Sequence, residues 1–182
     1  MSNEMNNSES DRNNKIIKEV IDWAKHIVIA IFIAFFLLNF VIINANVPTE
    51  SMVSTIMVND RIFANRLAYL FSEPKRGDIV VFKYPDDEKL LYVKRVIGLP
   101  GDTVEIKKQQ VYINNIPIEE PYVREPMAGS FGPFKVPEGK YFMMGDNRNH
   151  SNDSRFWTNK YVDKNKILGK AKIKYFPGFK LF

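Results

Sequence analysis

The strongest hydrophobic pattern in the chain is an apolar run over residues 27–43, in which Asn39 is the single polar residue and no side chain is charged. With Trp23 and Ala24 this run approaches the roughly 20 residues that a membrane-spanning helix needs. A buried core helix would need protein on all sides, and a cleaved signal peptide has a shorter apolar segment followed by small residues. We therefore predict a retained transmembrane anchor over residues 27–45, with those two readings as the alternatives.

Basic side chains lie unequally on the two sides of this run. Four of them precede it, and the first one after it is Arg61. The four are Arg12, Lys15, Lys18 and Lys25. Because positively charged flanks stay in the cytoplasm, we expect residues 1–26 to be a cytoplasmic tail and residues 46–182 to be extracytoplasmic. The first 14 residues are rich in Asn and Ser, which is typical of disorder.

Beyond the apolar run the pattern is that of short strands. Runs rich in Val, Ile, Tyr and Phe are bounded by Gly, Pro, Asn and Asp, which predicts strands separated by turns. The predicted strands cover residues 78–84, 90–97, 102–107, 110–113 and 140–144. Residues 59–70 are compatible with a strand that passes into a short helix. Residues 121–139 contain four prolines and three glycines and predict an irregular surface loop. The fold is therefore expected to be mostly β.

Charge and composition limit the function classes. Lys170, Lys172 and Lys174 alternate with apolar residues, which predicts a strand with one basic face, either solvated or attracted to anionic lipid headgroups. The net charge of +5 does not indicate a nucleic-acid partner, because Lys and Arg are spread along the chain. The absence of cysteine excludes disulfides and thiolate metal sites. No phosphate-binding loop, dinucleotide fingerprint or HExxH motif is present, so we expect no cofactor and no metal.

Three segments carry more polar residues than folding alone would require. They are residues 48–52, 92–102 and 145–155. The first contains a serine, and a serine needs a base before its hydroxyl can attack a carbonyl.

The candidate bases are two histidines and a lysine. The predicted topology separates His26 from Ser51 by the bilayer, roughly 30 Å. His150 lies in a polar loop, where a solvated histidine is the usual finding. Lys94 lies in an apolar strand, and burial there can lower its pKa from about 10.4 to near 8, where half of it is neutral. Spacing alone leaves the choice between His150 and Lys94 open.

Four motifs together resemble the bacterial type I signal peptidases, the membrane-anchored serine proteases of family S26 that remove signal peptides from exported proteins. The motifs are Ser51-Met52 and the segments 76–82, 94–102 and 145–155. Glu50 and Ser54 depart from the residues that the family often has around the nucleophile, which bears on the shape of the substrate pocket.

The roughly 40 residues between the last two motifs resemble the compact Gram-positive form of the family, with one anchor. That form implies an antiparallel β catalytic domain over residues 46–182, with a small inserted β subdomain over residues 103–142.

The resemblance implies a role for each matching residue. Ser51 would be the nucleophile and Lys94 the general base. The backbone N–H of Ser51 and the hydroxyl of Thr49 would form the oxyanion hole. Ser151 would orient the amine of Lys94, and Met52 would either line the substrate pocket or belong to the core.

Four charged residues of the last motif are expected to support the site. Asp153 and Arg155 would form an ion pair, and Asp146 and Arg148 would fix the same loop.

The implied substrates are secreted preproteins with small residues at the first and third positions before the cut. About seven residues join the apolar run to Ser51, a reach of at most about 25 Å, so the site would work near the outer leaflet, in contact with membrane lipids and close to the secretion translocon. Two alternatives are a related Ser/Lys protease with one dedicated substrate and an inactive anchored β module that binds secretion or cell-wall partners.

Overall fold

The computed structural model describes the backbone of residues 2–182, and the side chains of these residues except 2–14 and Ile16. The chain divides after Val41 into a helical unit and a β unit. The helical unit consists of α1 (Ser2–Phe36) and a π-helical continuation, η1 (Leu37–Val41).

Residues Ile17–Val41 of this helix are long and apolar enough to cross a membrane, and none of this segment is buried in protein. At 1.5 Å per residue, 25 residues span about 37 Å, more than the roughly 30 Å hydrocarbon core. Asn39 donates its side-chain N–H to the carbonyl of Phe35 at 2.8 Å, so this amide has a partner within the helix. The exposure of the helix does not support the core-helix alternative.

Two sequence boundaries differ from the structure. The predicted anchor extends to residue 45, but the helix ends at Val41 because the next residues pair as a strand with β2. The predicted disordered tail over residues 1–14 is helical from Ser2 onward. Extending an existing helix adds one hydrogen bond per residue without a new nucleation step. The composition of the first 14 residues gives no information about this effect of the neighbouring helix.

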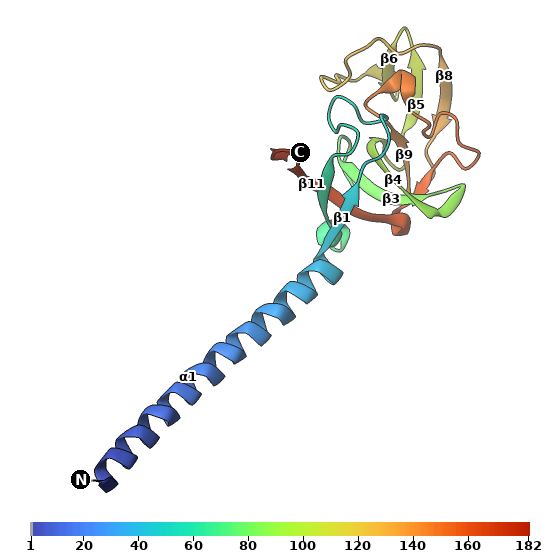
Figure 1. The fold of residues 1–182 in the computed structure, drawn as a ribbon. Coiled ribbons are helices and arrows are strands. Elements are labelled where there is room, and N and C mark those ends of the chain that lie inside the picture. The colour runs from blue at the N-terminus through green and yellow to red at the C-terminus, as the bar shows by residue number, and fades with distance from the viewer. Residues whose placement is uncertain (1) are drawn as a thin grey trace. The chain divides into compact units, whose positions relative to one another are not determined.

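The β unit contains one large and one small antiparallel sheet (Figure 1). In the large sheet the strand order is β1-β2-β11-β3-β4-β9-β10, with β12 paired to β11. Its strands are β1 (Ile42–Asn46), β2 (Arg61–Asn65), β3 (Ile79–Tyr84), β4 (Asp87–Gly98), β9 (Lys140–Met144), β10 (Val162–Asp163), β11 (Ile167–Phe176) and β12 (Lys180–Leu181).

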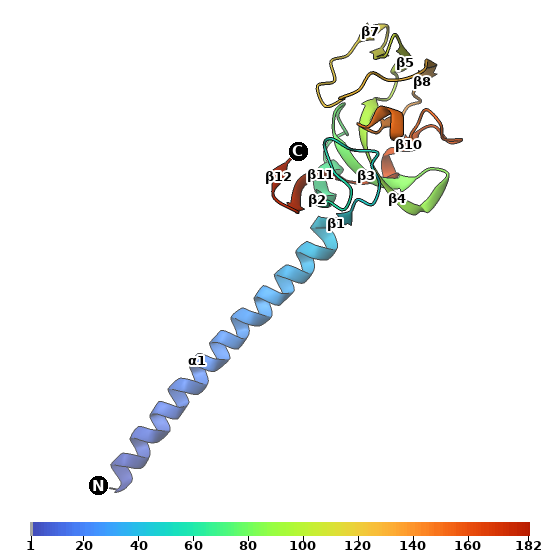
Figure 2. The same ribbon diagram turned by 45° about the horizontal axis from the view of Figure 1, so that its top comes forward.

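The small sheet has the order β7-β6-β5-β8. Its strands are β5 (Thr103–Lys107), β6 (Gln110–Ile113), β7 (Ile116–Pro117) and β8 (Phe131–Lys135). Figures 1 and 2 both place it at the end of the β unit that is remote from β1 and β2. The 3₁₀ turns are η2 (Arg66–Tyr69), η3 (Arg148–His150) and η4 (Lys164–Lys166).

The mostly β prediction is confirmed, and the five predicted strands appear close to their expected bounds. The prediction of an irregular loop over residues 121–139 is wrong in part, because Phe131–Lys135 form β8. This strand forms because it pairs with β5, and local composition cannot predict that contact. The small sheet ends at Lys135, whereas β9 belongs to the large sheet.

Three apolar clusters make up the core of the β unit. The cluster that contains Met52 and Val81 packs around β1, β2 and β11. A second, around Ile97 and Phe142, joins the small sheet to β9. The third surrounds Trp157. Strand β4, which carries Lys94, pairs with β3 on one side and β9 on the other, so its backbone is fixed along both edges.

The basic face predicted near the C-terminus is largely neutralised. On β11, Lys170 lies 2.5 Å from an oxygen of Asp78, and Lys174 lies 3.3 Å from an oxygen of Asp60. Lys172 between them is exposed. The alternation predicted the strand, but carboxylates from other parts of the chain compensate two of its three charges.

Candidate active site

Ser51 and Lys94 meet in the structure although 43 residues separate them in the sequence. Ser51 lies in a turn, and Lys94 is in β4; both side chains are buried, with each residue only 4% exposed. The amine of Lys94 donates a hydrogen bond to the hydroxyl oxygen of Ser51. When the amine is neutral, the same contact allows it to accept the proton of the hydroxyl.

The environment of Lys94 favours its neutral form. Burial lowers the pKa of Lys94 from 10.5 to about 8, because the protonated amine loses hydration. The carboxylates of Asp153 and Asp146 act in the opposite direction, and the positive charge of Arg155 lowers this pKa further. With a pKa of about 8, roughly a tenth of the amine is neutral at pH 7. Lys94 can therefore serve as a base near neutral pH.

A cleft of about 430 Å³ opens at this pair. Thr49 borders it and places its hydroxyl oxygen 3.3 Å from that of Ser51. Much of the remaining wall is apolar and comes from the segment before Thr49 and from β4. The other lining residues are Asn46, Val47, Pro48, Glu50, Leu90, Leu91, Tyr92, Val93, His150 and Asn152.

The loop over residues 145–155 packs tightly against the serine turn. The backbone N–H of Asn147 donates to the carbonyl of Ser51 at 3.0 Å. At Gly145 an added Cβ would lie 2.4 Å from that same carbonyl and 2.3 Å from the hydroxyl of Ser151. Only glycine fits there. Gly145 and Asn147 were not assigned roles from the sequence, because a close approach between distant segments leaves no local pattern.

Ser151 is buried beside this glycine. Its hydroxyl has no hydrogen-bond partner among the residues that the structure describes. The predicted bond between Ser151 and the amine of Lys94 is therefore not formed in this structure.

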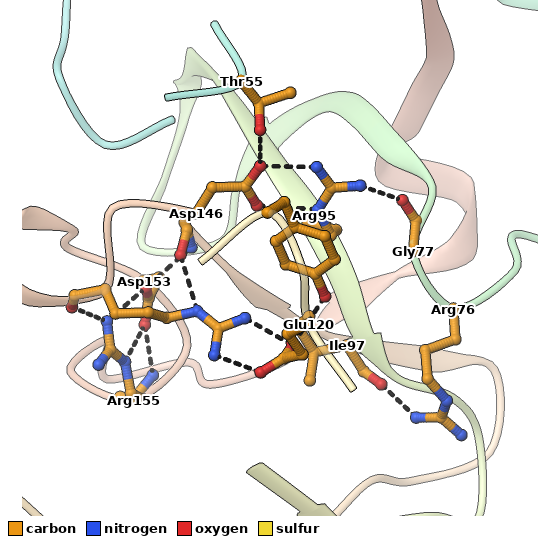
Figure 3. Close-up of polar contacts among 12 residues, drawn as sticks. Thr55, Arg76, Gly77, Arg95, Ile97, Glu120, Asp146, Asp153 and Arg155 are labelled. Carbon is orange, nitrogen blue, oxygen red and sulfur yellow. Dashed lines mark hydrogen bonds and ion pairs between the residues drawn. The ribbon is translucent and has the colours of Figure 1, made fainter. Parts of the chain in front are cut away.

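The predicted ion pair between Asp153 and Arg155 is present and almost fully buried (Figure 3). Two guanidinium nitrogens of Arg155 donate to the carboxylate at 2.8 and 2.9 Å. Asp153 also accepts from the backbone N–H of Gly145 at 3.0 Å, and Arg155 donates to the carbonyl of Arg148 at 2.6 Å. The pair thus holds both ends of the loop.

Asp146 and Arg148 have partners outside the loop, and Figure 3 shows those of Asp146. Arg95 donates to Asp146 at 2.8 and 2.6 Å, and Thr55 donates to the same carboxylate at 2.5 Å. Arg148 donates to both oxygens of Glu120 at 2.7 and 2.6 Å.

These outside partners were not assigned from the sequence. The sequence did point to Arg95, since this residue follows Lys94 within one of the motifs shared with the family. The sequence did not point to Glu120, because this residue lies in the connection between β7 and β8, outside every matched motif.

Met52 is fully buried and belongs to the core cluster around β1 and β2. It is not among the residues that line the cleft. Packing is the role that the structure describes, and its contribution to a substrate pocket stays a prediction.

Neither histidine is a hydrogen-bond partner of Ser51 among the residues that the structure describes. His150 borders the cleft, but its ring lies 3.6 Å from the carboxylate of Glu50, and both side chains are 61% exposed. The hydroxyl of Ser51 has its hydrogen-bond contacts with Lys94 and Thr49. His26 lies in α1, where its ring contacts the carbonyl of Asp22. The geometry thus favours Lys94 over His150 as the base.

The described residues offer no group of three or more His, Asp or Glu side chains that could hold a metal ion. The groups brought together at Ser51 are a hydroxyl nucleophile, an amine of lowered pKa and hydrogen-bond donors. Such a set is suited to acyl transfer.

Comparison with known proteins supports this chemistry. The family model described as signal peptidase, peptidase S26 matches residues 20–176. Signal peptidase I S of Bacillus subtilis strain 168 is 41% identical over 171 residues, which cover 88% of this chain and 91% of that protein. A signal peptidase I of Bacillus amyloliquefaciens is 41% identical over 180 residues, covering 93% and 95%.

A solved structure is also similar in sequence. The crystal structure of a signal peptidase I from Enterococcus faecalis V583 is 33% identical, covers 54% of this chain and 97% of that chain, and has a TM-score of 0.49. The family match over most of the chain, together with relatives of about 40% identity that align nearly end to end, shows that the chain belongs to the signal peptidase family, peptidase S26.

Proposed function

We propose that this signal peptidase I cleaves preproteins with Ser51 as the nucleophile and Lys94 as the general base. The observation that carries the proposal is the buried hydrogen bond from the amine of Lys94 to the hydroxyl of Ser51. Burial lowers the pKa of that amine to about 8, which keeps a useful fraction of it neutral.

In the first step Ser51 attacks the carbonyl carbon of the scissile bond, and Lys94 accepts the hydroxyl proton. The backbone N–H of Ser51 and the hydroxyl of Thr49 stabilise the oxyanion that forms. Lys94 then passes the proton to the leaving amine, and the mature protein departs with a free N-terminus. A water molecule, deprotonated by Lys94, hydrolyses the remaining ester and regenerates Ser51.

Ser151 is proposed to orient the amine of Lys94 when substrate is bound. A buried hydroxyl without a partner is unfavourable by about 1–3 kcal/mol, so a partner gained in the complex would stabilise it. The buried pairs of Asp146, Asp153 and Arg155 support the loop that presents Ser151.

The substrates are proposed to be secreted preproteins with small residues at the first and third positions before the cut. Family membership supports the class of substrate, and the resemblance to the family supports the preference for small residues.

We propose that Ile17–Val41 crosses the cell membrane once, with the N-terminus in the cytoplasm and the β unit outside. The asymmetry of basic residues supports this orientation. In the β unit, Ile42, which directly follows the helix, pairs with Asn65. Shortly after Asn65 come Leu70, 63% exposed, and Phe71, 98% exposed. These apolar side chains are suited to contact with lipid, and the site would then work near the point where preproteins leave the translocon.

The test is cleavage of a purified preprotein with an Ala-x-Ala site by the detergent-solubilised full chain, with the cut mapped by mass spectrometry. We expect cleavage after the second alanine by the wild type, none by Ser51→Ala or Lys94→Ala, and near-normal cleavage by His150→Ala. Cleavage that survives Lys94→Ala but is lost in His150→Ala would refute the assignment of the base. A panel of unrelated preproteins tests whether the enzyme is general or dedicated to one substrate.

A further inference from the structure

One rim of the catalytic cleft carries charge that the proposed chemistry does not use. Glu50 and His150 both border the cleft, with 3.6 Å between a carboxylate oxygen of one and Nδ1 of the other. Apart from Lys94, they are the only acidic or basic side chains among the described residues that line it. Both are 61% exposed, so a bound peptide can reach them.

The position of Glu50 next to the nucleophile is fixed through its backbone. The side-chain amide of Asn147 donates to the carbonyl of Glu50 at 3.1 Å, and the backbone N–H of the same residue donates to the carbonyl of Ser51 at 3.0 Å. These bonds tie both residues to one loop. The backbone of Glu50 is therefore held beside the reacting serine, and its exposed carboxylate extends from that fixed point.

The rest of the cleft has a different character. Val47 and Pro48 precede the serine turn, and Leu90, Leu91 and Val93 precede Lys94 in β4; all line the cleft. Apolar walls suit the part of a preprotein that lies before the cut, because that part is the uncharged end of a signal peptide. The residues after the cut, which begin the mature protein, would then pass the charged rim.

We propose that Glu50 and His150 form a charge-selective subsite for the first residues of the mature chain. The inference rests on the proposed Ser51 and Lys94 site. The carboxylate of Glu50 attracts a basic side chain at these positions and repels an acidic one, while His150 bounds the subsite on the other side. Because both groups are exposed, the preference is modest, about two- to fivefold, and salt weakens it.

The experiment compares preproteins that are identical except for Lys, Gln or Glu at the first or the second position after the cut. The measured quantity is the ratio of kcat/KM for the Lys and Glu substrates, in about 20 mM and about 500 mM salt. The enzymes are the full-length wild type, Glu50→Gln, Glu50→Lys and His150→Ala. Glu138→Gln is the matched control, because Glu138 is an exposed carboxylate that does not line the cleft.

We expect a ratio of about two to five for the wild type at low salt, falling toward one at high salt. Glu50→Gln should bring the ratio close to one, and Glu50→Lys should invert it. His150→Ala and Glu138→Gln should keep the preference for Lys. A ratio near one in the wild type at both positions, or a preference unchanged in Glu50→Gln, would overturn the proposal.

The Gln substrate separates this outcome from failure of the proposed function. If the wild type cleaves it and Ser51→Ala does not, the catalytic site is intact and only the charge preference is at issue. If the wild type fails to cleave the Gln substrate, or Ser51→Ala still cleaves it, the proposed site itself is wrong.

Discussion

Replacing Lys94 by methionine should abolish cleavage and yet stabilise the fold at neutral pH. The pKa of Lys94 is lowered by burial from 10.5 to about 8, and each pKa unit corresponds to 1.36 kcal/mol. Holding the protonated amine in the folded state therefore costs about 3 kcal/mol below pH 8. Methionine removes that cost but also removes the hydrogen bond to Ser51, worth about 1 kcal/mol. The expected net gain in the free energy of unfolding at pH 7 is about 2 kcal/mol.

The difference in unfolding free energy between Lys94→Met and the wild type should depend on pH. Between about pH 8 and 10.5 the unfolded chain binds the Lys94 proton and the folded chain does not, so the wild type gains stability as pH rises through that window. The advantage of Lys94→Met should accordingly shrink from about 2 kcal/mol at pH 7 to near zero at about pH 9.5.

Urea unfolding of the detergent-solubilised full chain at the two pH values measures this difference. Lys172→Met is the control, because Lys172 is exposed on β11, and it should stay within about 0.5 kcal/mol of the wild type. If Lys94→Met is less stable than the wild type at pH 7, or its gain is the same at both pH values, burial of the protonated amine is not what lowers the pKa.

Three further predictions follow from the site. The kcat/KM of the wild type should rise with pH and level off above about pH 8, because only the neutral amine of Lys94 can act as a base. A pH profile that is already flat from pH 6 would contradict this. Thr49→Val should lower kcat by about 10²–10³ with little change in KM, because the hydroxyl of Thr49 is the proposed second oxyanion donor, whereas Thr49→Ser should retain much of the rate. Glu120→Gln should destabilise the fold by about 3–5 kcal/mol, because it leaves the buried guanidinium of Arg148 uncompensated. Glu119→Gln, at an exposed position, is the control in the same urea titration. Equal effects of the two substitutions would refute a stabilising role for the ion pair of Arg148 and Glu120.

Strand positions could be predicted from the sequence where the pattern is local. The strand over residues 110–113 appears at its predicted bounds, because apolar residues between turn signals suffice to specify it. β8 was missed because its residues include glycine and proline and are ordered by pairing with β5. The helix end was misplaced for the same reason, since residues 42–45 are apolar enough to continue the helix but pair with β2 instead.

The chemical groups of the site and the local pair of Asp153 and Arg155 could be predicted from the sequence, but the partners from distant segments could not. The motif around Lys94 also contained Arg95, yet only the fold shows that this guanidinium binds Asp146. The pairing of Arg148 with Glu120 joins the last motif to a segment without any motif. Ion pairs between distant segments depend on how the sheets pack, and local patterns carry no information about that packing.

The sequence by itself determined the long apolar segment, the mostly β character and a short set of candidate site residues, because hydrophobic periodicity and motif residues are local properties. Only the tertiary structure favours Lys94 over His150 as the base, since it buries the lysine against the hydroxyl of Ser51 and leaves the histidine exposed beside Glu50. The lowered pKa of Lys94 likewise belongs to the fold, because burial is produced by every segment packed around the amine.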